Sequence, residues 1–221
     1  MVVQHNLTAM NANRQLSGVT SAQAKSTEKL SSGYRINRAA DDAAGLSISE
    51  KLRSQIRGLD KAASNSQDGI SLVQVAEGAL NETHSILQRM NELATQAAND
   101  TNTSTDRASI QKEMDQLTSE IDRIRSTTQF NSMNLLDGSF TGKELQVGAL
   151  SGQKISISIG NMNSSKLKIS GLKVSSFSSA GKAMAAIQKA INSVSTQRSK
   201  LGALQNRLEH TINNLNTTSE N

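Results

Sequence analysis

The sequence predicts a mainly α fold, an elongated antiparallel helical bundle or coiled coil with a small β-hairpin region. From Asp41 to about Ala98, apolar or small residues recur in alternating steps of four and three, a heptad spacing that keeps one stripe of a helix against a partner. No proline occurs in the 221 residues to interrupt such helices. Only 35% of the residues are apolar and 2% are aromatic, which suits thin seams between helices better than a wide globular core.

The N-terminal part, residues 1–40, is predicted to be a helical assembly segment with its linker. From His5 to about Ser32, apolar residues fall at roughly helical spacing among polar ones. This weakly amphipathic helix buries little apolar surface, so we expect it to fray unless another helix or subunit covers it. The stretch SSGYRINRAADDAAG then interrupts the period, and Asp41 or Asp42 is suited to cap the helix that follows.

Residues 41–128 are predicted to form a long helix and its antiparallel companion. Gly58, Gly69 and Gly78 each cost the long helix about 1 kcal/mol relative to Ala, so we expect a partner to approach their backbone closely. Ser104 or Thr105 is suited to cap the companion. The seam of the long helix comprises Leu52, Ile56, Leu59, Ala63, Ser66, Ile70, Val73, Leu80, Leu87, Ala94 and Ala98, and that of the companion Ile110, Met114, Leu117, Ile121 and Ile124.

The pattern changes to short strands over residues 129–178, where LLDGS carries a turn signal and QVGAL, KISISI and KLKISGLKV alternate apolar with polar residues. Ile155, Ile157 and Ile159 would then share one face of a strand. Helical spacing returns over residues 179–221, with a third seam at Met184, Ile187, Ile191, Val194, Leu201, Gln205, Leu208, Ile212 and Leu215.

Charge is unevenly distributed along the chain, whose net charge is +5. Residues 61–142 contain six basic and eleven acidic residues, whereas residues 143–200 contain nine basic and one acidic residue. The lysines are not interleaved with aromatic residues that could stack on bases, which argues against a nucleic-acid partner. We favour two complementary surfaces that meet within the fold or between subunits.

The residues favour assembly or recognition over catalysis. The chain has no cysteine, and His5, His84 and His210 lack a second ligand three or four residues away, so no metal or cofactor is expected. We interpret His84 as a packing residue. Asp41 and Asp42 are adjacent and point in different directions, which suits helix capping better than paired acid and base chemistry. No glycine-rich phosphate loop occurs, and no apolar run reaches the roughly 20 residues of a membrane span. We therefore expect neither an enzyme nor membrane insertion.

The sequence resembles the N-terminal region of bacterial flagellin from KLSSGYRINRAADDAAG to ILQRMNELATQAAND and again at EIDRIRSTTQFNSMNLLDG. The segment AINSVSTQRSKLGALQNRLEHTINNLNTTSEN resembles the start of the flagellin C-terminal region. The resemblance implies a secreted, extracellular subunit of the flagellar filament, with other flagellin subunits as partners. It also implies export through the flagellar export apparatus without a cleaved signal.

Flagellins continue beyond such a segment into a further C-terminal helix, whereas this sequence ends at Asn221. The chain is therefore expected to lack the helix that completes the filament interior. It would also lack the segment that the export chaperone grips. A second interpretation is a secreted recognition or signalling module, or a hook-associated relative, that does not polymerise in this form.

The resemblance also implies recognition by the Toll-like innate receptor for flagellin. The family motif matches LQRMNELA, so Arg89 and Leu93 carry over, and Glu113 matches the acidic residue of the adjacent helix. An arginine fork, an apolar knob and a charge partner suit an interface. From the residues alone, these three side chains could equally form an ordinary solvated face.

The loop that joins the first helix to the bundle is interpreted as an assembly element. Arg35, Arg38, Asp41 and Asp42 are its candidate residues. Helix capping by the two aspartates alone is the alternative.

Overall fold

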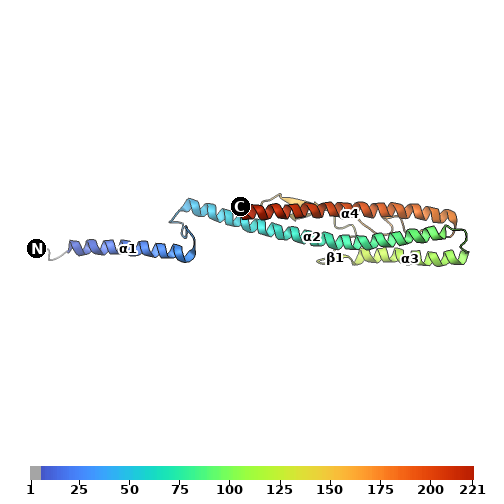
Figure 1. Ribbon diagram of the computed structural model, residues 1–221, viewed down its shortest axis with the longest axis horizontal. Helices are drawn as coiled ribbons and strands as arrows, with labels where there is room; N and C mark the ends of the chain where they lie inside the picture. Colours follow the sequence, from blue (N-terminus) through green and yellow to red (C-terminus); the bar gives the residue numbers. More distant parts are fainter. Residues whose placement is uncertain (1–5) are drawn as a thin grey trace. The chain divides into compact units, whose positions relative to one another are not determined.

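The computed structural model describes residues 6–221 (Figure 1). The predicted N-terminal segment includes residues 1–5, which lie outside the described residues. The chain divides into two compact units, the first ending at Gln55 and the second beginning at Ile56. The predicted mainly α fold with a small β region is confirmed. The elements are α1 (Leu7–Ser32), α2 (Ala43–Ala97), α3 (Ser104–Thr127), β1 (Gln129–Phe130), β2 (Met133–Asn134), β3 (Lys143–Gln146), β4 (Lys154–Ile157) and α4 (Phe177–Glu220).

Helix α1 of the first unit is held by capping and backbone hydrogen bonds. The Asn6 side chain accepts the N–H of Ala9 at 3.1 Å, and Gly33 ends the helix in the left-handed conformation with φ of 70°. No residue of α1 is buried, which agrees with the weak amphipathicity of the sequence. Its large apolar side chains are more than half exposed, namely Leu7, Met10, Leu16, Val19 and Leu30.

In the second unit, α2, α3 and α4 lie side by side around one core (Figure 1). Helix α3 returns antiparallel to α2 after a turn in which the Arg107 Nε donates to the carbonyl of Ala97 at 2.9 Å. Helix α4 also runs antiparallel to α2, because Leu59 packs with Leu215 near the end of α4. Long apolar side chains from all three helices are fully enclosed, among them Leu80, Leu87, Met90, Met114, Ile121 and Ile187.

The buried seam of α2 begins later than predicted. Leu52 and Ile56 remain 53% and 40% exposed, and Leu59 is the first seam residue that is buried. The prediction was wrong at these two positions, which precede the packing contact of Leu59 with Leu215 of α4. A heptad pattern gives the direction of a seam but not the length of its partner.

Two of the three α2 glycines have the predicted close neighbour. A Cβ built on Gly58 would lie 2.9 Å from the Cβ of Ala149, and one on Gly69 would overlap the Leu145 side chain. Both of these neighbours belong to the β region, and the Cβ on Gly69 would also lie 3.3 Å from Leu208 of α4. Around Gly78 nothing lies within 4 Å of a built Cβ, so the prediction was wrong there.

Capping boxes begin two helices of the second unit. Thr103 accepts the N–H of Asp106, whose carboxylate accepts the N–H of Thr103, and Ser176 and Ser179 exchange the same pair of bonds at the start of α4. The cap of α3 therefore precedes the predicted Ser104 or Thr105.

The β region consists of two antiparallel hairpins, β1 with β2 and β3 with β4. Ile155, Ile157 and Ile159 are 4%, 1% and 0% exposed and share the inner face, as predicted. The predicted turn is confirmed as well, because Gly138 has φ of 91° and the Asp137 carboxylate accepts the N–H of Ser139 at 2.8 Å.

The stretch KLKISGLKV forms turns instead of the predicted strand. Its N–H groups at Leu167 and Ile169 donate to the carbonyls of Asn163 and Ser164, and Lys168 adopts φ of 58°. The alternation reflects burial of every second side chain against the bundle, whereas a strand also needs a neighbouring strand to pair its backbone.

Candidate interaction sites

Arg89 of α2 and Glu113 of α3 form an ion pair on the outside of the bundle. The Nε of Arg89 donates to Oε1 of Glu113 at 3.0 Å, and its NH1 donates to Oε2 of Glu92 at 3.1 Å. The hydrogen bond that Arg89 donates to Glu113, followed by the one that it donates to Glu92, raises the pKa of Arg89. All three side chains are about half exposed or more, so this group braces two helices while it remains open to a partner.

Glu92 is not among the site residues predicted from the sequence. Its position three residues after Arg89 on the same helix was the signal that could have identified it.

Leu93, the third predicted receptor residue, lies in the core and is 2% exposed. The structure therefore brings Arg89 and Glu113 together but does not place Leu93 on the surface beside them. The interpretation of Leu93 as an exposed apolar knob is wrong.

The two aspartates of the predicted assembly loop bind backbone groups of the first unit. The Asp41 carboxylate accepts the N–H groups of Arg38 and Asn37 at 3.2 and 3.4 Å, and these bonds lower its pKa. Asp42 accepts the N–H of Gly45 at 2.9 Å, which caps α2. Capping by Asp42 is thus part of the structure, whereas Asp41 holds the loop itself.

The loop is also tied to α1. Arg38 donates to the Glu28 carboxylate at 2.9 Å. Asn37, which was not a predicted site residue, donates from its side-chain amide to the Ser32 hydroxyl at 2.7 Å and to the carbonyl of Glu28 at 3.2 Å. Arg35 is exposed and makes no ion pair within residues 6–221, so the structure does not join it to the other three predicted residues.

Metal ligands are not gathered in the described part of the chain: no group of three or more His, Asp or Glu residues could hold an ion there. His84 is half-buried, with a ring nitrogen 3.1 Å from the Gln88 amide nitrogen. None of the helices between residues 6 and 221 is apolar enough over sufficient length to span a bilayer.

Family models match both ends of the chain. Residues 3–141 match the bacterial flagellin N-terminal helical region, and residues 184–221 match the bacterial flagellin C-terminal helical region. The chain is 53% identical to a flagellin of Halalkalibacterium halodurans, over all of this chain and 82% of that protein. It is 48% identical to a flagellin of Bacillus subtilis, over all of this chain and 84% of that protein.

Solved structures of other proteins share the fold of this chain. The crystal structure of Bacillus cereus flagellin superposes with a TM-score of 0.62 at 34% identity, over 69% of this chain and 88% of that one. A putative flagellar hook-associated protein from Vibrio parahaemolyticus superposes with a TM-score of 0.69 over 82% of this chain and 95% of that one. Because its identity is only 14%, it shares the fold and supports no statement about function.

Proposed function

The chain belongs to the bacterial flagellin family and is a structural subunit of the extracellular flagellar filament, and we propose that one face of its bundle is also bound by the Toll-like innate receptor for flagellin. The observation that carries this proposal is the exposed group formed by Arg89, Glu92 and Glu113. A planar guanidinium held by two carboxylates presents a defined set of donors and acceptors to a partner.

Titration against the receptor ectodomain tests this role. Arg89→Ala removes the fork and is expected to weaken binding roughly tenfold or more, as for a central interface arginine. Arg123→Ala is the matched control, because Arg123 is an exposed arginine of the same bundle that pairs with Glu120 three residues away. Equal affinities for the Arg89→Ala variant and the unmodified chain would refute the proposal.

The loop of Arg35, Arg38, Asp41 and Asp42 is proposed as an assembly element. Its support is the set of bonds that Asp41 and Asp42 make to backbone N–H groups, since a loop of fixed conformation can present the same surface in every copy. Arg35 is its exposed and unpaired member among residues 6–221, and is proposed as the group that meets a neighbouring subunit.

Filament formation followed by sedimentation and electron microscopy tests the loop. The double variant Asp41→Ala/Asp42→Ala is expected to lose most filament mass in a background that polymerises. Glu50→Ala, which removes another exposed carboxylate of the first unit, is expected to polymerise normally. Normal filaments from the double variant would show that the aspartates act only within the subunit.

The four-part division into residues 1–40, 41–128, 129–178 and 179–221 is proposed as the functional organisation of the chain. We further propose that the flagellar export apparatus secretes the chain unfolded. The absence of cysteine supports this, because no disulfide has to be broken or formed. Secretion that persists in cells lacking the export apparatus would exclude that route.

A further inference from the structure

Opposite charges are segregated between α2 and the later part of the second unit, which contains β4 and most of α4. Residues 62–88 of α2 contain three acidic residues and no lysine or arginine, whereas residues 145–208 contain nine lysines and arginines and no acidic residue. Glu77 pairs with Arg198 at 3.7 Å. Asp68 and Glu82 are exposed and make no ion pair within residues 6–221. Asp68 and Glu82 together are called the acidic stripe of α2.

Four exposed cations form a matching stripe along α4, namely Lys182, Lys189, Lys200 and Arg207. Their spacings of seven, eleven and seven residues keep them within about 20° of one another around a helix, over a length of about 37 Å. No ion pair neutralises them in the described part of the chain. We call them the basic stripe of α4.

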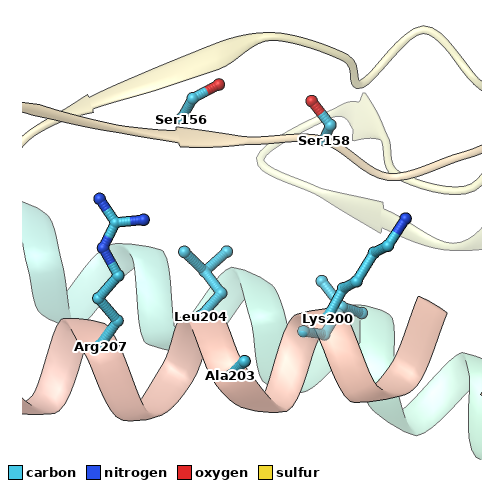
Figure 2. A pocket seen from close by; sticks show the side chains of 7 residues that line it. Ser156, Ser158, Lys200, Ala203, Leu204 and Arg207 are labelled. Atoms are coloured by element: carbon cyan, nitrogen blue, oxygen red, sulfur yellow. The ribbon is translucent and has the colours of Figure 1, made fainter. Parts of the chain in front are cut away.

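Two grooves run beside the basic stripe. One, of about 300 Å³, lies between α4 and the outer face of β4, and Lys200 and Arg207 extend from α4 toward that strand on either side of Leu204 (Figure 2). The other, of about 420 Å³, is lined by Lys182 and Lys189 together with Lys166 and Lys168. Cations clustered in a groove without a counter-charge repel one another, so an acidic partner that entered would be held favourably.

We propose that the basic stripe of α4 binds the acidic stripe of α2 in a second copy of this chain. Asp68 and Glu82 are fourteen residues apart with Val75 midway, so they span about 21 Å of helix, which fits within the length of the basic stripe. Within one copy, the ion pair of Glu77 with Arg198 joins the same two helices outside both stripes.

This inference rests on the filament function, which brings copies of the chain together at high local concentration. The acidic stripe and the basic stripe lie on different helices, and neither is complementary to itself. A contact between two different surfaces can be heterologous, so that it repeats from copy to copy as an open polymer requires. The side chains lining both grooves include no aromatic residue for base stacking, which argues against nucleic acid as the occupant.

Disulfide trapping tests the contact in pairs of molecules, and the chain has no cysteine of its own. Val75 is 41% exposed within the acidic stripe, and Ala203 lines the groove beside Lys200 and Arg207. A mixture of Val75→Cys and Ala203→Cys chains is expected to yield roughly tenfold more cross-linked dimer than either variant alone, and the excess should disappear at about 1 M salt. Equal yields in all three samples, or an excess that is insensitive to salt, would overturn the proposal.

Charge reversal in the same pair identifies the groups responsible. Lys200→Glu/Arg207→Glu in the Ala203→Cys chain should suppress the mixed dimer, as should Asp68→Lys/Glu82→Lys in the Val75→Cys chain, and the two reversals together should restore it. Lys143→Glu/Lys173→Glu is the control, because it changes the net charge equally at exposed lysines outside the basic stripe. Failure of the joint reversal to restore the dimer in folded chains would contradict the inference.

Filament formation is tested separately, by electron microscopy of the unmodified chain. If filaments form but cross-linking shows no preference for the mixed pair, the inference fails and the filament function stands. If the mixed pair is preferred but no filaments form, the contact stands and polymerisation by this chain fails.

Discussion

The Asp122 carboxylate of α3 accepts both the backbone N–H and the hydroxyl of Ser164, at 2.9 and 2.7 Å. These residues are 42 positions apart, and Ser164 is 5% exposed. The two bonds fasten the turn region before α4 to the bundle and satisfy polar groups that water cannot reach.

Asp122→Ala is therefore expected to lower the free energy of unfolding by about 1–3 kcal/mol, because the Ser164 groups lose their acceptor. Urea denaturation followed by circular dichroism measures the change. Asp115→Ala, at an exposed carboxylate nearly two helical turns away on the same helix, is the control and should change the free energy by less than about 0.5 kcal/mol. A similar effect of the two substitutions would contradict this account.

Leu93→Ala is expected to lower the free energy of unfolding by about 2–5 kcal/mol, because it leaves a cavity in the core. Arg89→Ala, four residues earlier on an exposed face, should stay within about 0.5 kcal/mol of the unmodified chain. The same denaturation experiment compares them. If Leu93→Ala left stability unchanged, its assignment to the core would be incorrect.

The glycines of α2 offer a matched pair of substitutions. Gly78→Ala should raise the free energy of unfolding by up to about 1 kcal/mol, since alanine favours the helix and its Cβ meets nothing within 4 Å. Gly58→Ala should lower it, because the new Cβ would lie 2.9 Å from the Cβ and 3.3 Å from the Cα of Ala149, and the loop that carries Ala149 must move. Thermal unfolding of both variants checks the signs. Stabilisation by both substitutions would show that the loop carrying Ala149 can move without lowering the free energy of unfolding.

The capping box of α3 predicts that the stability of the fold depends on pH. The Thr103 hydroxyl and, after it, the Thr103 backbone N–H lower the pKa of Asp106 below its ordinary value of 3.8. A carboxyl group with a lowered pKa stabilises the fold fully above its unfolded value, and this contribution is lost as the pH falls toward the folded value. The difference in Tm between the unmodified chain and Asp106→Ala should thus be largest near neutral pH and shrink below about pH 4. A difference that stays constant from pH 7 to pH 2.5 would refute this role.

Short-range features of the sequence were enough to predict much of the fold. The alternation of Ile155, Ile157 and Ile159 predicted their shared buried face, and the Asp137-Gly138 pair predicted its turn. Such signals act through neighbouring residues, whose relative directions are set by the backbone period alone. The prediction failed for KLKISGLKV because the same alternation can arise without a strand partner.

The position of Leu93 shows what a single heptad seam cannot report. The predicted seam passes through Leu87 and Ala94, and Leu93 falls beside it. Helix α2 packs against two helices, so its buried surface is wider than one seam and includes Leu93 together with Met90. Arg89 and Glu113 accordingly form the expected charge pair, whereas Leu93 lies in the core, and a role of these residues in receptor binding stays a prediction.

By itself, the sequence determined the helices, their polar and apolar faces and the segregation of charge between α2 and α4, because each depends on residue type and on a backbone period of known length. Only the tertiary structure decided which faces are covered. The buried seam of α2 begins at Leu59, Gly78 remains open, and Asp122 reaches Ser164 because of contacts between residues far apart in the chain. Such contacts depend on where partner elements end and how many pack on one helix, and no local pattern records either.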